Sequence, residues 1–347
     1  MLLRALAREP LARPPVWLMR QAGRYMDEYQ AIRSRVDFLT LCKTPELAAE
    51  VSLQPLRAFD VDAVIMFCDI LIPCEAMGMT LHFGDGGPRF ETPVRSAADV
   101  ARLAIPDPHA RMGFVGDLLR LLRHELRQQP QTALIGFAGA PWTLAAYMIE
   151  GGGSRHFMHL KQMLYNEPAV LRQLLDKLSE TIIAYLGAQI EAGAQAVQLF
   201  DTWAGIVDAP TYRAFIQPSV ARIVEAIGDK APVTLYVNGS PHLLEAMAQT
   251  GVDCVSVDWL TPLSDARARL GPNLALQGNL DPVALLAGPD VVRGLALELL
   301  SEGGARGFIA NVGHGLLPQT PRENVRLLVD TIRDSARLLA TGASHGV

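Results

Sequence analysis

Three arginines near the start of the chain have the spacing to hold a small anionic ligand. Arg20 and Arg24 lie four residues apart in the stretch PVWLMRQAGRY, residues 15–25, and Arg33 follows nine residues later. A guanidinium binds an oxyanion through two parallel hydrogen bonds, which the ammonium of lysine does not. The apolar lead-in VWLM predicts a buried strand or the wall of a cleft beside them. The alternative is a solvated basic face, because only four of the 31 basic residues are lysines.

Asp69 is a carboxylate between two apolar runs, VIMFC and ILIP. Burying a carboxylate is costly unless hydrogen-bond donors surround it, which favours a functional role. Aspartate is also favoured at the N-cap of a helix, but Ile70-Leu71-Ile72-Pro73 is a poor first helical turn. For Asp201 and Asp258, which also follow apolar runs, the N-cap and the functional interpretation both stay open.

His314 and Tyr147 are two further candidates for ligand contacts. His314 stands between glycines in NVGHG, and glycines let the backbone approach a ligand closely. A lone histidine is more often structural, so both interpretations stand, while the other seven histidines lie in helix or loop contexts. Tyr147, in APWTLAAYMIEGGG, follows a Pro-Trp turn and is either a core residue or a ligand contact.

Eight short apolar runs alternate with longer helical patterns along the chain. Continuous apolar runs are typical of parallel strands that are covered on both faces. Eight such steps predict an α/β fold, a single (β/α)8 TIM-type barrel. The expected strands are Val16–Met19, Asp62–Phe67, Thr132–Phe137, Ala196–Phe200, Val233–Val237, Cys254–Val257, Leu274–Gln277 and Gly307–Ala310.

Nearly every run is followed by a polar residue or a glycine. In a TIM barrel the active site lies at the carboxyl ends of the strands, so this pattern predicts one shared cleft. The residues that follow the runs are Asp69, Asp201, Thr202, Asn238, Gly239, Asp258, Gly278, Asn279, Asn311, Gly313 and His314.

No linker, repeat or charge block interrupts the chain, which predicts one domain over residues 1–347 with a frayed tail at about 338–347. The clearest helix is expected over Pro168–Glu191, where apolar residues recur at three- and four-residue steps. An open doubly wound sheet is the alternative fold. That fold normally carries a glycine-rich nucleotide fingerprint after its first strand. The glycine runs at 84–87, 151–153 and 303–304 lack its spacing, and the first and third are expected to be turns.

The bulk composition excludes several classes of protein. The 347 residues are 50% hydrophobic and carry a net charge of −5. The chain has no run of lysine and arginine long enough to indicate nucleic-acid binding. Four cysteines without zinc-site spacing suit a reducing cytosol. No signal peptide and no run of 18 apolar residues occurs, so we expect a soluble, cytoplasmic protein without membrane association.

Taken together, these motifs resemble the uroporphyrinogen decarboxylase family of haem biosynthesis. The resemblance covers nearly the whole chain, in order and at matching distances. It is carried by PVWLMRQAGRY, FCDIL, GFAGAPWTLAAYMIEGGGS, VQLFDTWAG and NVGHGLLPQTP.

The resemblance implies a single (β/α)8 barrel, usually a homodimer, that uses no metal and no organic cofactor. The implied reaction converts the four acetate side chains of uroporphyrinogen III to methyl groups, giving coproporphyrinogen III and four CO2. Asp69 matches the aspartate that faces the centre of the macrocycle, and Asp69, Arg20 and Tyr147 are the implied catalytic residues. Thr202 stands where many members have serine, and the departure of YVNGS from the commoner sequence leaves the role of Asn238 open. The implied substrate-binding residues are Arg20, Gln21, Ala22, Gly23, Arg24, Arg33, Asp69, Tyr147, Thr202 and His314.

The implied chemistry accounts for these residue types. Eight substrate carboxylates call for arginines, and one carboxylate at the centre of the macrocycle is able to accept from all four pyrrole N–H groups. Protonation of a pyrrole carbon creates a cation, which a fixed carboxylate stabilises without reorganisation. Arg20 is a candidate proton donor, although a free guanidinium loses its proton only above about pH 12. Tyr147 and His314 are candidates to orient carboxylates or relay protons.

Two other functions remain as hypotheses. The first is a methyltransferase of the same wider barrel superfamily, which needs a zinc site of histidine and cysteine, and no His-x-Cys occurs here. The second is a tetrapyrrole-binding regulatory protein that has lost activity. The joint presence of Arg20, Arg24, Asp69, Tyr147 and His314 argues against that loss.

Overall fold

The core of the protein is a curled sheet of seven parallel strands. The structure, a computed structural model, describes residues 1–84, 86–304 and 306–342. The strands follow one another in chain order around the sheet, and each pairs in parallel with the next. They are β1 (Ala63–Ile65), β4 (Ala133–Gly139), β5 (Ala196–Asp201), β6 (Val233–Val237), β7 (Cys254–Ser256), β8 (Ala275–Leu280) and β9 (Phe308–Val312).

The segment 15–19 takes the eighth place and closes the sheet into a barrel. Val16 forms a parallel bridge with Ala310 of β9, and the Trp17 amide donates to the Ala310 carbonyl at 3.3 Å. On its other side, the Val16 carbonyl accepts from the Asp62 amide at 2.8 Å. The predicted (β/α)8 barrel is therefore confirmed, although this eighth segment is bridged rather than a regular strand.

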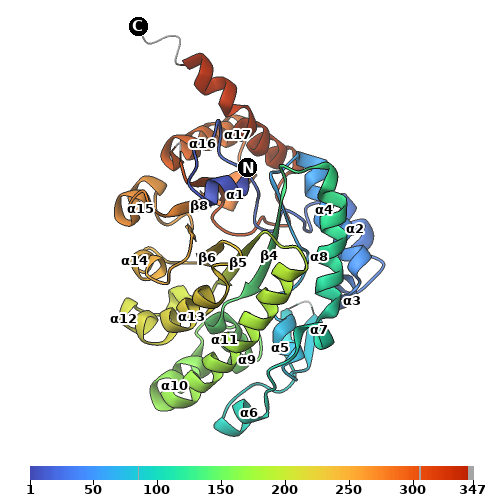
Figure 1. Cartoon of the computed structure of the whole chain (residues 1–347), viewed down its shortest axis with the longest axis vertical. Helices are drawn as coiled ribbons and strands as arrows, with labels where there is room; N and C mark the ends of the chain where they lie inside the picture. Colours follow the sequence, from blue (N-terminus) through green and yellow to red (C-terminus); the bar gives the residue numbers. More distant parts are fainter. Residues whose placement is uncertain (85, 305, 343–347) are drawn as a thin grey trace.

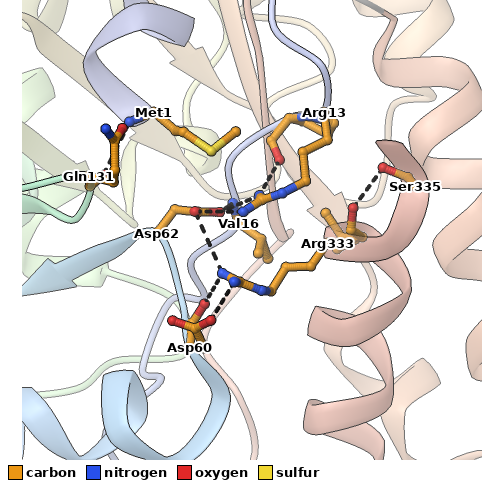
Figure 2. Close-up of polar contacts among 10 residues, drawn as sticks. Met1, Arg13, Val16, Asp60, Asp62, Gln131, Arg333 and Ser335 are labelled. Atoms are coloured by element: carbon orange, nitrogen blue, oxygen red, sulfur yellow. Dashed lines mark hydrogen bonds and ion pairs between the residues drawn. The ribbon is translucent and has the colours of Figure 1, made fainter. Parts of the chain in front are cut away.

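The Asp62 carboxylate fastens this closure at the amino-terminal end of β1 (Figure 2). It accepts from both terminal nitrogens of Arg13, at 2.7 and 2.9 Å, and from the Val16 amide at 2.8 Å. Arg333, in the last helix, lies 3.8 Å from Asp62 and also pairs with Asp60. Both partners of the Arg13–Asp62 pair are almost fully buried, with side chains 11% and 7% exposed.

A polar network crosses the barrel interior. The indole of Trp17 donates to the side chain of Gln277 at 2.9 Å. Gln277 in turn donates to Gln198 and to Ser256, at 3.0 and 2.9 Å. All four residues are buried, and these hydrogen bonds between facing strands replace some of the bonds that their polar atoms lose to water, although Nε2 of Gln198 has no partner in the network.

Helices cover the outside of the strands, as Figure 1 shows around β4, β5, β6 and β8. The helix predicted over Pro168–Glu191 is confirmed with those bounds, and its buried stripe includes Leu171, Leu174, Leu178 and Ile182. Within the described residues, no helix is long and apolar enough to cross a membrane. The helices are α1 (Leu2–Leu6), α2 (Asp27–Arg33), α3 (Phe38–Lys43), α4 (Pro45–Phe59), α5 (Ile72–Ala76), α6 (Ala97–Arg102), α7 (Pro108–Arg111), α8 (Gly113–Glu125), α9 (Pro141–Glu150), α10 (Met158–Asn166), α11 (Pro168–Glu191), α12 (Ala209–Thr211), α13 (Gln217–Ile227), α14 (Leu244–Ala248), α15 (Leu263–Leu270), α16 (Pro289–Gly303) and α17 (Arg322–Gly342), with the short turns η1 (Leu126–Gln128), η2 (Ala204–Ile206), η3 (Tyr212–Ile216) and η4 (Pro282–Leu286).

Several bounds differ from the sequence prediction. The glycines at 84 and 87 flank the turn of an antiparallel hairpin, β2 (Leu81–Gly84) and β3 (Gly87–Phe90), which the sequence analysis did not predict. Strands β5, β8 and β9 continue through polar residues that were expected to follow them, because their ladder bonds involve only the backbone. The tail expected over 338–347 begins inside α17, and its residues 343–347 lie outside the described part of the chain.

Candidate active site

A cavity of about 300 Å³ opens at the carboxyl ends of the strands. It gathers residues from the loop 20–24, called the arginine loop below, from the ends of β1, β4 and β5, from the hairpin, from α9 and from the segments after β5 and β9. Seven of the ten predicted binding residues line it, which are Arg20, Gln21, Ala22, Asp69, Tyr147, Thr202 and His314. The remaining lining residues are Met19, Ile65, Met66, Phe67, Cys68, Ile70, Leu71, Pro88, Phe137, Phe200 and Gly315.

Arg20 projects from a loop that the rest of the barrel holds firmly. The backbone at Arg20 is left-handed, with φ 59°, a conformation that non-glycine residues rarely adopt. Next to it, the buried side chain of Gln21 accepts from the Leu18 amide at 3.1 Å and donates to the Ala63 carbonyl at 3.1 Å. The amide of Gln21 thus ties the loop to β1, and its contribution to the cavity wall is positional.

Asp69 stands just after β1 and is partly buried. Its Oδ1 accepts from the Leu71 amide at 2.8 Å, which closes a local turn before α5 begins at Ile72. Asp69 is therefore not the N-cap of that helix. Burial raises the pKa of Asp69 to about 6, while the Leu71 amide and the charge of Arg20 act in the opposite direction. At neutral pH the cavity holds an ionised carboxylate that has lost part of its hydration.

His314 lies flat against Tyr236, with ring centroids 5.8 Å apart and planes at 23°. Burial and the charge of Arg20 lower the pKa of His314 to about 4, so the imidazole is neutral at physiological pH. The Tyr236 hydroxyl donates to the Gly313 carbonyl at 2.9 Å and contacts the side-chain oxygen of Asn238 at 3.3 Å. Asn238 thus supports the tyrosine on which His314 stacks.

Tyr147 and Thr202 come from two elements that one aspartate joins. Tyr147 is on α9 and packs edge-on against Trp203, with ring centroids 6.1 Å apart. The fully buried Asp201, at the end of β5, accepts from the Thr143 amide at 3.1 Å and from its hydroxyl at 2.7 Å. The same hydroxyl accepts from the Trp203 amide at 3.0 Å. Asp201 is therefore not the N-cap of a helix that follows it in the chain; it accepts from the first turn of α9, which precedes it.

Three predicted binding residues do not line the cavity. Arg24 is exposed, and Arg33 donates to the Val36 carbonyl at 2.6 Å. Gly23 lies in the loop between Arg20 and Arg24, and a β-carbon on it would lie 3.2 Å from the Arg20 carbonyl oxygen.

The carboxylate of Asp258 accepts hydrogen bonds from backbone amides, including that of Leu260 at 3.0 Å, which gives it a structural role.

The apolar wall is the part of the site that sequence reasoning missed. Phe137 and Phe200 lie near the carboxyl ends of β4 and β5, and their rings meet edge-on with centroids 5.7 Å apart. Pro88 reaches the cavity from the unpredicted hairpin. A signal existed for the two phenylalanines, because both stand at the strand ends where the polar candidates were sought. Pro88 had no such signal, since short hairpins carry little periodicity.

The arrangement suits a ligand with an apolar body, carboxylate arms and a positive centre. Arg20 supplies a cation and Asp69 an anion, while His314 and Tyr147 supply neutral hydrogen-bonding groups. Apolar side chains surround them and lower the local dielectric, which strengthens each electrostatic contact. Among the residues that the structure describes, no three His, Cys, Asp or Glu side chains gather as a metal site.

Known proteins match the chain over nearly its whole length. The family model described as uroporphyrinogen decarboxylase matches residues 1–335. The uroporphyrinogen decarboxylase of Serratia proteamaculans is 48% identical over 339 residues, which cover 95% of each chain. That of Syntrophotalea carbinolica is 50% identical over 325 residues, covering 93% of this chain and 94% of its own.

A solved structure supports the fold independently. A methyltransferase from Methanosarcina mazei superposes with a TM-score of 0.80 over 96% of this chain and 97% of its own. Its sequence is only 22% identical, so this likeness speaks for the barrel and not for the reaction. The family match and the two relatives carry the assignment instead: the chain belongs to the uroporphyrinogen decarboxylase family.

Proposed function

We propose that the chain converts the four acetate side chains of uroporphyrinogen III to methyl groups, releasing four CO2 and coproporphyrinogen III. The chain would then be a carboxy-lyase of tetrapyrrole biosynthesis. Its membership of the uroporphyrinogen decarboxylase family supports this reaction. The observation that carries it to this site is the pairing of Arg20 and Asp69 in one apolar cavity at the carboxyl ends of the strands.

Asp69 is proposed to face the centre of the bound macrocycle and accept from its pyrrole N–H groups. Protonation of a pyrrole ring carbon gives a cation, and the electrons of the bond to the leaving carboxylate then flow into the ring as CO2 departs. A proton adds to the resulting exocyclic methylene, and the ring carbon returns its proton, so each round consumes one proton in all. A fixed carboxylate beside the cationic intermediate lowers the barrier because it needs no reorganisation.

Arg20 is proposed to bind a substrate carboxylate and to take part in proton delivery. Tyr147, Thr202 and His314 line the same cavity and are proposed to orient the other arms. A macrocycle with eight carboxylate arms exceeds a cavity of about 300 Å³. The outer arms must therefore extend beyond it, where Gly23 and Arg24 of the arginine loop and Arg33 at the end of α2 are proposed to meet them.

The remaining features of the proposal come from the family. We expect a cytoplasmic homodimer with the two clefts near the interface, working without a metal or an organic cofactor. The electron sink is then the protonated pyrrole of the substrate itself.

One assay tests the proposal directly. The purified protein is incubated anaerobically with uroporphyrinogen III, and the products are separated by their number of carboxylates. We expect intermediates with seven, six and five carboxylates and a final product with four. Recovery of the intact eight-carboxylate substrate, with binding unimpaired, would instead support a binding protein without activity.

A further inference from the structure

The side chain of Arg20 passes directly over Gly315, one residue beyond His314. A β-carbon on Gly315 would lie 2.2 Å from Cδ of Arg20, 2.6 Å from Cγ and 2.7 Å from Nε. Favourable contacts between carbon atoms occur at about 3.5–4.0 Å. Any side chain at position 315 is therefore incompatible with the present position of Arg20.

The backbones on both sides of this contact are fixed. The Leu316 amide donates to the Met19 carbonyl at 2.9 Å, which joins the residues adjacent to Gly315 and Arg20. The Met19 amide donates to the buried side chain of Asn311 at 2.9 Å. Because the two chains are held together here, a clash at position 315 is relieved by moving the flexible side chain of Arg20.

The backbone of Gly315 does not itself require glycine. Its φ lies outside the left-handed region, in contrast to Arg20, so alanine fits its backbone without strain. Gly313 is different, because a β-carbon there would lie 2.6 Å from the Trp259 amide nitrogen and 3.0 Å from the Asn279 carbonyl oxygen. Of the two glycines that flank His314, one is required by backbone packing and the other leaves room for Arg20.

We propose that Gly315 is a positioning residue, whose missing side chain gives the Arg20 stem its path across the cavity wall. Gly315 lines the cavity next to Arg20, and its proposed effect on the reaction is exerted through the arginine. This inference rests on the proposed role of Arg20 in binding a substrate carboxylate.

The first test is the Gly315→Ala variant. A displacement of about 1 Å in a positioning contact costs about 10² in rate, so we expect kcat/KM for uroporphyrinogen III to fall about 10²-fold. The melting temperature should stay at the wild-type value. The matched control is Gly294→Ala, on the exposed face of α16, where a β-carbon would meet nothing within 4 Å. It should retain wild-type activity.

The deciding measurement is a double-mutant cycle with Arg20→Ala. If Gly315 acts through Arg20, the double variant should have the same kcat/KM as Arg20→Ala alone. Losses that multiply in the double variant, or full activity of Gly315→Ala beside an impaired Arg20→Ala, would overturn the positioning role. Full activity of Arg20→Ala would overturn the proposed role of Arg20 and this inference with it.

If Gly315→Ala folds poorly, the melting temperatures of the single and double variants test the same contact. Removing the Arg20 side chain opens the space that the new methyl group needs. The double variant should then recover the wild-type melting temperature, and a double variant as unstable as Gly315→Ala would overturn the proposal.

Discussion

Replacing Asp69 with asparagine should reduce activity and increase stability together. Asparagine keeps the side-chain oxygen that accepts from the Leu71 amide at 2.8 Å, so the local turn is preserved. It removes the negative charge that is proposed to stabilise the cationic intermediate. Loss of one such preorganised group costs about 10²–10³ in kcat.

The gain in stability follows from the pKa of Asp69. Burial raises it from an ordinary value of 3.8 to about 6, so the folded protein disfavours the ionised carboxylate. Below pH 3.8 the carboxyl is protonated in both the folded and unfolded states, and there is no cost. As the pH rises towards 6 the unfolded chain ionises first, and above 6 the cost is constant. The difference corresponds to about 3 kcal/mol of unfolding free energy, which the asparagine variant should regain at pH 7.

Two measurements check this reasoning. Denaturant unfolding at pH 4 and at pH 7 should show a stability gain for Asp69→Asn that is present at pH 7 and small at pH 4. The wild-type kcat/KM should rise with pH through an apparent pKa near 6. The control is Asp117→Asn, at an exposed aspartate on α8, which should change neither the stability nor the pH dependence of kcat/KM. Wild-type turnover by Asp69→Asn would refute the electrostatic role, and an equal gain at both pH values would refute the raised pKa.

Four further predictions address binding, cofactor dependence, assembly and folding. Arg20→Lys should lose nearly as much kcat/KM as Arg20→Ala, because an ammonium does not form a bidentate contact; kinetics of the lysine variant equal to wild type would contradict this. Activity should survive exhaustive chelation and dialysis, with no stoichiometric zinc in the purified protein, and strict dependence on an added metal would contradict the electron-sink argument. Sedimentation should show a homodimer at micromolar concentration, against which a fully active monomer would count. Asp62→Ala should lower the unfolding free energy by about 3–5 kcal/mol, since it leaves Arg13 buried and unpaired; Glu50→Gln, in an exposed ion pair, should change it by at most about 1 kcal/mol in denaturant titrations.

Apolar runs predicted the barrel well because parallel strands are buried on both faces. Strand β6 has the predicted bounds, and all seven residues of β4 are buried. The strand ends were harder to place, because ladder bonds use only the backbone and continue through polar residues such as Asp201 and Asn311. The closure of the barrel by Asp62 could not be predicted from sequence patterns, because its partners Arg13 and Arg333 are far apart in the sequence.

The candidate site was predictable where residue type and strand position agreed. Asp69 and His314 were found in this way, and both line the cavity. Tyr147 also lines it, but it lies on α9, and only the family resemblance favoured it over a core position. Arginine spacing was a weaker guide, because residues four apart in a loop need not point the same way. Only Arg20 of the three arginines reaches the described cavity wall. Its path over Gly315 depends on a contact across 295 positions of sequence, which no local pattern records.

Burial has the largest effect on the pKa values of Asp69 and His314, and the charge of Arg20 lowers both of them. It lowers the pKa of Asp69, against the larger effect of burial, and so helps to keep that carboxylate ionised. It also lowers the pKa of His314, in the same direction as burial, and so keeps that imidazole neutral. Asp69 and Arg20 thus give the cavity one anion and one cation, and His314 adds no further charge. A cationic intermediate formed beside Asp69 meets a carboxylate that burial has left short of hydration. The burial that disfavours the ionised form of this carboxylate therefore also strengthens its interaction with the intermediate.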